Sequence, residues 1–338
     1  MKEKSLSSKL SWRIILIALV ISILSQLAAT IVIANGSIRS LQWWRESPKL
    51  LIYLNLIAIG SFVILYFVSH AVIKRVTRYS EELEAAKQAN VRMEADLTLA
   101  RDIQMGMLPK EFPPFLYAFL CPAKKVGGDL YDFILKDDEL YFALGDVSGK
   151  GLPSSLIMAI MSGILHLMDG MGLTMDETLR RVNDNFSKSN QTGMFVTLFV
   201  ARLNLKTGHL DYCNGGHCPL LIIPPDSDPY LLKSKPNLAI GMFEHFEYEA
   251  EQIDLKPGTR IIAYTDGVTE AEREDMSQYG NERLLQWAKH IAEEFPATSS
   301  SLDNSQEKTI VESLFASVNA FAEGNPQNDD ITIMSVRI

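Results

Sequence analysis

Two long apolar runs lie in the first fifth of the chain. Residues 14–34 are apolar apart from scattered Ser, Gln and Thr, and in residues 50–68 only Asn55 is a strong polar interruption. A helix needs about 20 such residues to cross the hydrocarbon core of a membrane. The pattern predicts a transmembrane hairpin over residues 1–73, with spans at about 14–34 and 50–70. A cleaved signal peptide is the alternative for the first run, but the run is long and no small-residue cleavage pattern ends it.

Lysine and arginine flank both runs. They precede the first run, occupy the short loop, and follow the second run at Lys74, Arg75 and Arg78. Because such residues collect on the cytoplasmic side, their distribution favours an N-terminus inside the cell. Trp43 and Trp44 in the loop suit an outer interfacial belt. We therefore expect a multi-pass protein of the inner (cytoplasmic) membrane, with the long C-terminal part in the cytoplasm.

The next segment, residues 74–108, is rich in Ala, Glu, Leu, Lys and Arg, which favour helix. Its apolar and uncharged positions alternate in steps of three and four. This heptad pattern puts Leu83, Asn90, Leu97 and Gln104 at a, and Ala86, Met93, Ala100 and Met107 at d. An Asn at an a position favours a two-stranded parallel pairing. We expect a helical coiled-coil linker that forms a homodimer; the alternative is a single helix that packs this stripe on its own catalytic domain.

Residues 109–338 change to short runs rich in Tyr, Phe, Val and Ile, separated by Gly, Asp or Pro. Strands are predicted at 116–123, 130–135, 140–146, 195–205, 209–214, 220–223, 246–253, 259–264 and 331–337, and helices at 152–173, 175–189, 281–294 and 306–322. The strands occur in groups, and the helices lie between these groups. This order predicts antiparallel sheets covered by helices, an α+β fold.

Charge and cysteine content narrow the function classes. A formal net charge of -9 argues against a nucleic-acid partner, because acidic surfaces repel phosphate backbones. Three cysteines are too few for a disulfide scaffold, and no second Cys/His pair completes a zinc site with Cys213 and Cys218.

Aspartates stand at the ends of the predicted strands. Asp129 follows Gly127 and Gly128 and begins a strand; Asp146 ends one and opens the turn Val-Ser-Gly-Lys-Gly. Asp266 ends another strand, and Asp329 and Asp330 precede the last. Each alone is an ordinary turn residue. Together, at one edge, they would repel one another unless a hard cation such as Mg²⁺ or Mn²⁺ bound them.

Five ordered motifs carry a resemblance to a known family. They are Gly-Gly-Asp-Leu-Tyr-Asp, Gly-Asp-Val-Ser-Gly-Lys-Gly, Asn-Gly-Gly-His-Cys-Pro-Leu-Leu, Tyr-Thr-Asp-Gly-Val-Thr-Glu and Asn-Asp-Asp-Ile-Thr. The chain from about residue 97 onward resembles the metal-dependent protein phosphatases (PPM family), in particular the bacterial branch of sporulation and sigma-factor regulators. The resemblance implies a two-sheet antiparallel β-sandwich flanked by helices over residues 109–338.

The same resemblance implies a chemistry. Asp146 would bridge two Mn²⁺ or Mg²⁺ ions, the Val147 carbonyl would ligate one, and Asp266, Asp329 and Asp129 would complete the set. Asp146 and Asp266 would act in catalysis through a metal-activated water that attacks the phosphorus. Asp330 stays open as a ligand or a supporting residue, and Asp132 and Lys150 are further candidates for supporting contacts around the ligands.

One position departs from the family. Eukaryotic members carry a proposed general acid, a His, two residues after the aspartate that matches Asp146, and here Ser148 stands there. His217 is another candidate acid, although its setting is more typical of a turn residue satisfied by backbone groups. The apolar helix predicted from Leu152 follows the metal-bearing turn, and the resemblance implies that such helices act as activation switches.

The expected function is hydrolysis of phosphoserine or phosphothreonine on a regulatory protein, an anti-sigma-factor antagonist, by a membrane-anchored protein serine/threonine phosphatase. The alternative is a catalytically silent phosphatase-like adaptor that docks signalling partners. A cyclic-nucleotide enzyme is a weaker alternative, since only the Gly-Gly-Asp motif suggests one.

Overall fold

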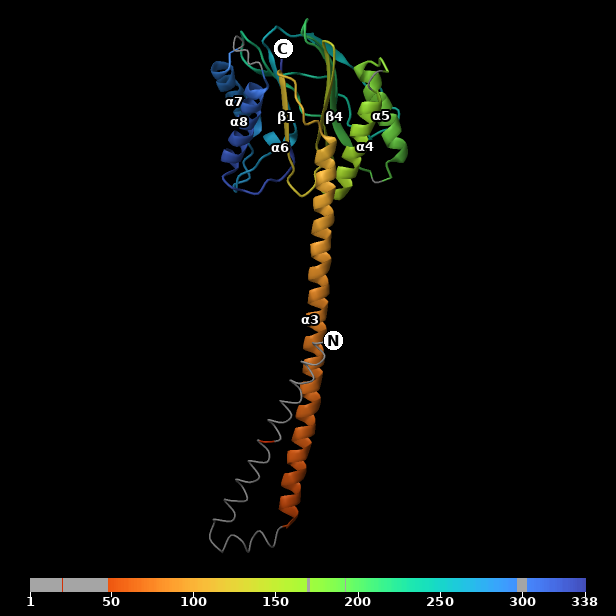
Figure 1. Cartoon of the computed structure of the whole chain (residues 1–338), viewed down its shortest axis with the longest axis vertical. Helices are drawn as coiled ribbons and strands as arrows, with labels where there is room; N and C mark the ends of the chain where they lie inside the picture. Colours follow the sequence, from red (N-terminus) through yellow and green to blue (C-terminus); the bar gives the residue numbers. More distant parts are fainter. Residues whose placement is uncertain (1–19, 21–47, 169–170, 192, 297–302) are drawn as a thin grey trace. The chain divides into compact units, whose positions relative to one another are not determined.

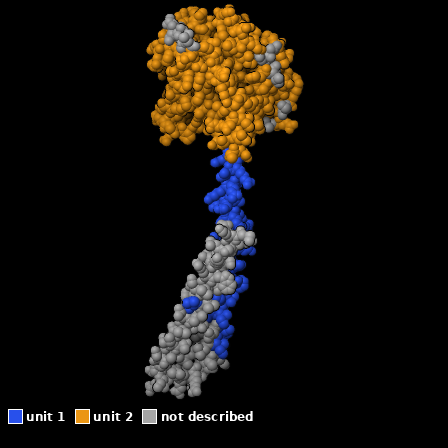
Figure 2. Space-filling model, in the orientation of Figure 1, with its two compact units in different colours: residues 1–94 blue, residues 95–338 orange. Residues whose placement is uncertain are grey.

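The computed structural model describes residues 20, 48–168, 171–191, 193–296 and 303–338. The predicted first span, 14–34, and the loop tryptophans lie outside the described residues, Val20 apart. The chain divides into two compact units, residues 1–94 and residues 95–338 (Figure 2). The division falls inside a helix, and the second unit includes the last part of the predicted linker.

Helix α3 (Pro48–Met107) runs without a break from the second apolar run through the predicted linker. Among the described residues, one helical segment, Leu56–Met107, is long and apolar enough to cross a membrane. Its apolar side chains are exposed on every side, including Ile57, Ile64 and Phe67, which is expected of a helix solvated by lipid. This is a weak indication of membrane association. The helix ends just before Pro109, which cannot continue the hydrogen-bond ladder.

The second unit, residues 95–338, contains two five-stranded antiparallel sheets (Figure 1), which confirms the predicted two-sheet fold. The first has the order β1-β10-β9-β6-β7 and the second β2-β3-β4-β5-β8. Their bounds are β1 Leu116–Cys121, β2 Leu130–Lys136, β3 Glu139–Val147, β4 Val196–Asn204, β5 His209–Gly215, β6 Leu221–Ile223, β7 Tyr230–Leu231, β8 Glu251–Asp254, β9 Arg260–Tyr264 and β10 Ile331–Arg337.

Helices cover the outer face of each sheet (Figure 1). Helices α4 (Leu152–Met168) and α5 (Met175–Ser189) pack on the β2–β5 side, while α7 (Gly280–Glu294) and α8 (Ser305–Ala322) pack on β1, β6 and β10. A short helix, α6 (Asp266–Thr269), follows β9. Fully buried aliphatic and aromatic side chains, among them Leu144, Phe199 and Met334, fill the space around the sheets.

The structure corrects one predicted strand. Of the predicted range 246–253, only residues 251–253 are in a strand, which continues to Asp254 as β8. In the preceding loop, the Asn237 side chain accepts a hydrogen bond from Glu249 N and donates one to Glu249 O, which satisfies the backbone as a neighbouring strand would. Phe246 and Tyr248 pack edge to face there at 4.9 Å, so burial of the two rings explains their apolar pattern. Strand β7 and helix α6 were not predicted.

Candidate metal centre

The aspartates of the motifs lie at matching ends of two strand pairs. Leu130 pairs with Gly145, so Asp129 and Asp146 extend from the same end of the β2–β3 pair. Ile333 pairs with Tyr264, so Asp266 and the Asp329–Asp330 pair extend from the same end of the β9–β10 pair. One strand pair belongs to each sheet, and the site is built where the two sheets meet.

Close backbone contacts join these four segments. A Cβ atom on Gly127 would lie 2.2 Å from Asp330 Oδ2, and one on Gly267 would lie 2.0 Å from the Asp330 carbonyl oxygen. A Cβ on Gly128 would lie 2.8 Å from the Val147 carbonyl oxygen. The glycines beside Asp129 and Asp266 are therefore required by close packing, because any side chain there would push the aspartate segments apart.

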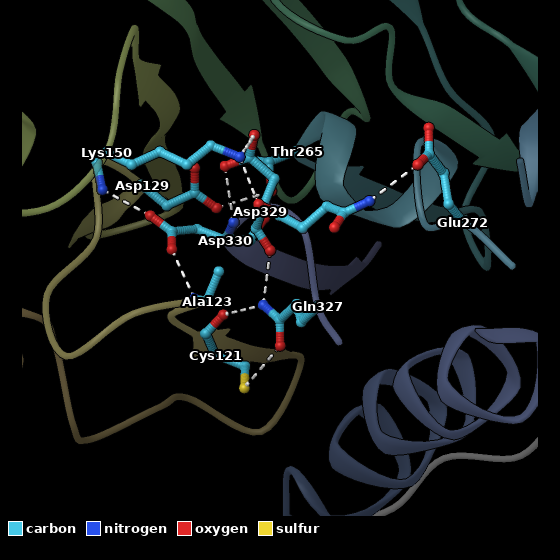
Figure 3. Close-up of polar contacts among 11 residues, drawn as sticks. Cys121, Ala123, Asp129, Lys150, Thr265, Glu272, Gln327, Asp329 and Asp330 are labelled. Atoms are coloured by element: carbon cyan, nitrogen blue, oxygen red, sulfur yellow. Dashed lines mark hydrogen bonds and ion pairs between the residues drawn. The ribbon is translucent and has the colours of Figure 1, made fainter. Parts of the chain in front are cut away.

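Asp129 is the deepest carboxylate of the site. It is 1% exposed, and its Oδ2 accepts a hydrogen bond from Thr265 Oγ1 at 2.8 Å (Figure 3). The same oxygen accepts a second bond from Thr332 Oγ1 at 2.6 Å. Thr265 and Thr332 also exchange backbone and side-chain bonds with each other. Burial raises the pKa of Asp129, as do the charges of Asp146 and Asp330, while the two hydroxyls lower it. Both threonines adjoin the aspartate motifs in the sequence, although their role was not predicted.

Asp330 is held by backbone groups of the other segments. Its Oδ1 accepts a hydrogen bond from Ala123 N at 2.8 Å, and its Oδ2 accepts one from Gly128 N at 2.6 Å (Figure 3). The residue is 7% exposed. With both oxygens engaged, Asp330 ties the end of β10 to the segment between β1 and β2.

Asp146, Asp266 and Asp329 are only partly buried and interact electrostatically. Burial raises the pKa of Asp146 to about 7, together with the charges of Asp266, Asp329 and Asp330. Burial and the charges of Glu270 and Asp329 raise the pKa of Asp266 to about 6. Mutual repulsion of this kind is relieved when a divalent cation binds.

Lys150 provides a positive charge at this cluster. Its Nζ lies 2.8 Å from Asp329 Oδ2 and also donates to the Asn328 carbonyl oxygen (Figure 3). Burial disfavours the ammonium charge, but the bond to Asp329 and the charges of Asp329, Asp330 and Asp266 together raise its pKa. The supporting contact expected of Lys150 is therefore an ion pair with Asp329.

Gln327 orients the loop that carries Asp329. Its Nε2 donates to the carbonyl oxygens of Cys121 at 2.8 Å and Asp329 at 2.7 Å, and its Oε1 accepts from the Cys121 thiol at 3.5 Å (Figure 3). These bonds fix the loop to the end of β1. The sequence offered no signal for this residue beyond its nearness to Asp329.

Asp132 lies apart from the other aspartates in its interactions. It is 4% exposed, accepts a hydrogen bond from Phe133 N, and pairs with His166 of α4, whose Nδ1 lies 2.8 Å from Asp132 Oδ2. The same nitrogen also lies 3.2 Å from the Ser162 carbonyl oxygen. Burial raises the pKa of Asp132 to about 6, and His166 opposes the rise. Asp132 therefore connects β2 to α4.

The end of α3 contacts the loop before Asp129. Gln104 is buried; its Nε2 donates to the Gly127 carbonyl oxygen at 2.7 Å, and its Oε1 accepts from Gly127 N at 3.2 Å. Leu83 and Met93 of the same predicted stripe are each 57% exposed. The last a position thus packs within its own chain, as in the single-helix alternative, while the preceding part of the stripe stays open to a partner.

The two positions considered for a general acid have structural contacts. Ser148 Oγ accepts a hydrogen bond from Phe195 N. His217 is buried, its Nδ1 lies 2.8 Å from Thr197 Oγ1, and burial lowers its pKa to about 4. The Asn214 side chain donates to the His217 carbonyl oxygen and accepts from His217 N, so His217 lies in a turn closed by Asn214.

The donor set suits a hard divalent cation. It consists of carboxylate oxygens that repel one another, and the Val147 carbonyl lies against the Gly128 backbone beside them. Among the described residues, no group of three or more His, Cys, Asp or Glu side chains is arranged so that it could hold a metal ion.

Comparison with known proteins identifies relatives over most of the chain. The model of the family "Stage II sporulation protein E (SpoIIE)" matches residues 136–338. The chain is 29% identical over 273 residues to Protein IcfG of Synechocystis, covering 71% of this chain and 41% of that protein. It is 26% identical over 200 residues to phosphoserine phosphatase RsbU of Bacillus subtilis, covering 58% and 59%. The chain thus spans about half the length of these relatives.

Among solved structures, the SiaA-PP2C domain of Pseudomonas aeruginosa is similar, with a TM-score of 0.62 and 21% identity. The match covers 74% of this chain and 98% of that domain. At this identity the likeness establishes the fold, which is of the PP2C type.

Proposed function

The chain belongs to the Stage II sporulation protein E (SpoIIE) family, and on that premise we propose that it is a metal-dependent protein serine/threonine phosphatase. Its substrate would be phosphoserine or phosphothreonine on a regulatory protein. The observation that carries the proposal is the convergence of four aspartate segments from two sheets, which raises the pKa of Asp146 through burial and the charges of Asp266 and Asp329.

The chain's own residues would hold two Mn²⁺ or Mg²⁺ ions. Asp146, Asp266 and Asp329, with the Val147 carbonyl, are the proposed ligands. Asp129 completes the proposed set, and its carboxylate is held by hydrogen bonds from Thr265 and Thr332. When bound, the cations supply the Lewis acid that activates water and offsets charge on the phosphoryl oxygens. Asp330 and Gln327 hold the ligand segments in register, and Asp132 supports the contact between β2 and α4.

A second candidate function is a silent adaptor that docks signalling partners. One observation favours it: among the described residues, no three candidate ligands are already assembled around a common point. The presence of the four metal-site aspartates favours the enzyme, since an adaptor would not need a cluster of repelling carboxylates.

We further propose that the protein is anchored in the inner membrane by two spans, with its catalytic unit in the cytoplasm. The exposed apolar part of α3 supports this for the second span. A homodimer through residues 74–108 and an anti-sigma-factor antagonist as substrate complete the proposal. Similarity to RsbU, a phosphoserine phosphatase, supports a phosphoserine substrate.

A phosphatase assay on the full chain in detergent tests the activity. With Mn²⁺ and a phosphoserine peptide, we expect turnover that EDTA abolishes. Asp146→Asn and Asp266→Asn should each lower the rate by about 10² to 10³-fold, the typical effect of losing one electrostatic contact to the transition state. Asp228→Asn is a matched control, because Asp228 pairs with Lys289 on the surface. If the wild type and both site variants gave the same rate, and this rate did not depend on metal, the adaptor would be supported instead.

Reporter fusions test the membrane arrangement. Green fluorescent protein fused after Ile338 should fluoresce, while alkaline phosphatase fused within the loop near residue 45 should be active outside the cytoplasm. The opposite pattern would reverse the proposed orientation. If neither reporter were active and the chain were found in the soluble fraction, the proposed membrane anchor would be wrong.

A further inference from the structure

The inference concerns Lys150 and rests on the proposed metal-dependent function. Lys150 Nζ lies 2.8 Å from Asp329 Oδ2 and donates to the carbonyl oxygen of Asn328, the residue before Asp329. The lysine lies in the turn after β3, while both acceptors lie in the loop before β10. This ammonium group therefore bridges the two segments that supply Asp146 and Asp329.

Each carboxylate oxygen of Asp329 is engaged by one contact. Its Oδ1 accepts a hydrogen bond from Asp330 N at 2.9 Å, and its Oδ2 is the oxygen paired with Lys150. Asp330 is fixed by Ala123 and Gly128, so the bond to Oδ1 belongs to the rigid part of the loop. Oδ2 is the oxygen outside that rigid part, so a cation that binds it competes with Lys150 for the same atom.

The contact can be broken without moving a strand. The side chains of Lys150 and Asp329 are 39% and 31% exposed, and ion pairs of such exposure contribute little. Lys150 stands between Gly149 and Gly151, whose φ angles are +87° and +88°. A Cβ at Gly151 would meet open space, so the turn around the lysine has room to change. A divalent cation carries twice the charge and prefers carboxylate oxygen.

We propose that Lys150 is a tethered cation that competes with the divalent metal for Asp329 and so sets the metal concentration at which the site fills. The ammonium compensates the carboxylates in the metal-free protein and is displaced when the metal binds. The lysine is then a determinant of metal affinity, not a support for the ligand loop, and these two roles predict opposite effects of its removal.

Binding of Mn²⁺ to the full chain in detergent, without substrate, distinguishes the roles. The readout is the loss of the electron paramagnetic resonance signal of free Mn²⁺ during titration. Lys150→Met should bind Mn²⁺ about fivefold more tightly than the wild type, the factor that corresponds to the upper range for an ion pair of this exposure. Lys150→Arg should stay near the wild-type affinity, because the charge is kept.

Two controls isolate the contact. Lys206→Met removes a surface lysine paired with Asp138 and should leave Mn²⁺ affinity unchanged. In an Asp329→Asn background, Lys150→Met should bring no further gain, since the contested carboxylate is gone. An unchanged or weaker affinity for Lys150→Met overturns the inference while leaving the proposed function in place. A wild-type chain that binds no Mn²⁺ overturns both.

Discussion

Replacement of Asp330 by alanine should destabilise the metal-free protein. Asp330 is a charged side chain within an acidic cluster, so its removal would be expected to relieve repulsion if charge alone mattered. Its oxygens, however, accept hydrogen bonds from Ala123 N and Gly128 N at 2.8 and 2.6 Å, and the residue is 7% exposed. We expect the lost bonds to outweigh the relieved repulsion.

The magnitude follows from the number and kind of bonds. A hydrogen bond to a charged group contributes about 1.5–3 kcal/mol, and a buried donor left without a partner costs a similar amount. Two such bonds give a loss of about 3–6 kcal/mol. Removing the repulsion between Asp330 and both Asp129 and Asp146 offsets about 1 kcal/mol of this loss. A net loss of about 2–5 kcal/mol lowers the melting temperature by about 4–20 °C for a domain of this size.

Thermal unfolding of the full chain in EDTA measures the effect, with Asp329→Ala as the matched control. Asp329 pairs with Lys150 at partial exposure and accepts a hydrogen bond from Asp330 N, so its replacement should change the melting temperature by no more than about 3 °C. In Mn²⁺ titrations the order should reverse, because Asp329 is the proposed ligand. A melting temperature for Asp330→Ala equal to or above that of the wild type would refute the scaffold role.

Three further predictions concern other features. In EDTA, stability should fall as pH rises from about 5 to 7.5, because Asp146, with a folded pKa raised to about 7 from 3.8, keeps a proton that the unfolded chain has lost; saturating Mn²⁺ should remove this slope in melting temperature. Glu307→Ala should cost about 3–5 kcal/mol in denaturant unfolding, since it leaves Arg260 buried without its partner, and a loss below 1 kcal/mol would contradict this. Asn90→Cys should form a disulfide-linked dimer on gels of oxidised membranes whereas Gln88→Cys, at an outer heptad position, should not; equal cross-linking would argue against the predicted register.

The sequence was sufficient for most of the catalytic unit because its elements follow local rules. Helix α5 was predicted with its observed bounds, since Thr174 and Glu177 form a capping box and its apolar stripe has helical spacing. Strand β10 was predicted equally well from a short apolar run. By contrast, the loop at 246–250 has strand-like composition, and only the contact with Asn237, distant in sequence, shows why it is not a strand.

The candidate site was likewise predictable from the sequence only in part. The aspartates could be found because each stands at a strand end with glycine nearby. The sequence could not separate Asp329 from Asp330, since adjacent residues at the start of a strand point in opposite directions and the facing partners are unknown. Nor could it show that Gln104, at a heptad position, bonds to Gly127, because a coiled-coil seam and a contact within the chain favour the same spacing.

The two bonds accepted by Asp330 have a consequence for the evolution of such domains. Because the carboxylate fastens the start of β10 to the chain between β1 and β2, its loss threatens folding before it affects chemistry. Descendants that have given up hydrolysis and persist as docking modules should therefore discard Asp146, Asp266 and Asp329 freely while retaining Asp330 and the glycines packed against it. A retained Asp330 would then be a poor criterion for judging whether a distant copy is still an enzyme.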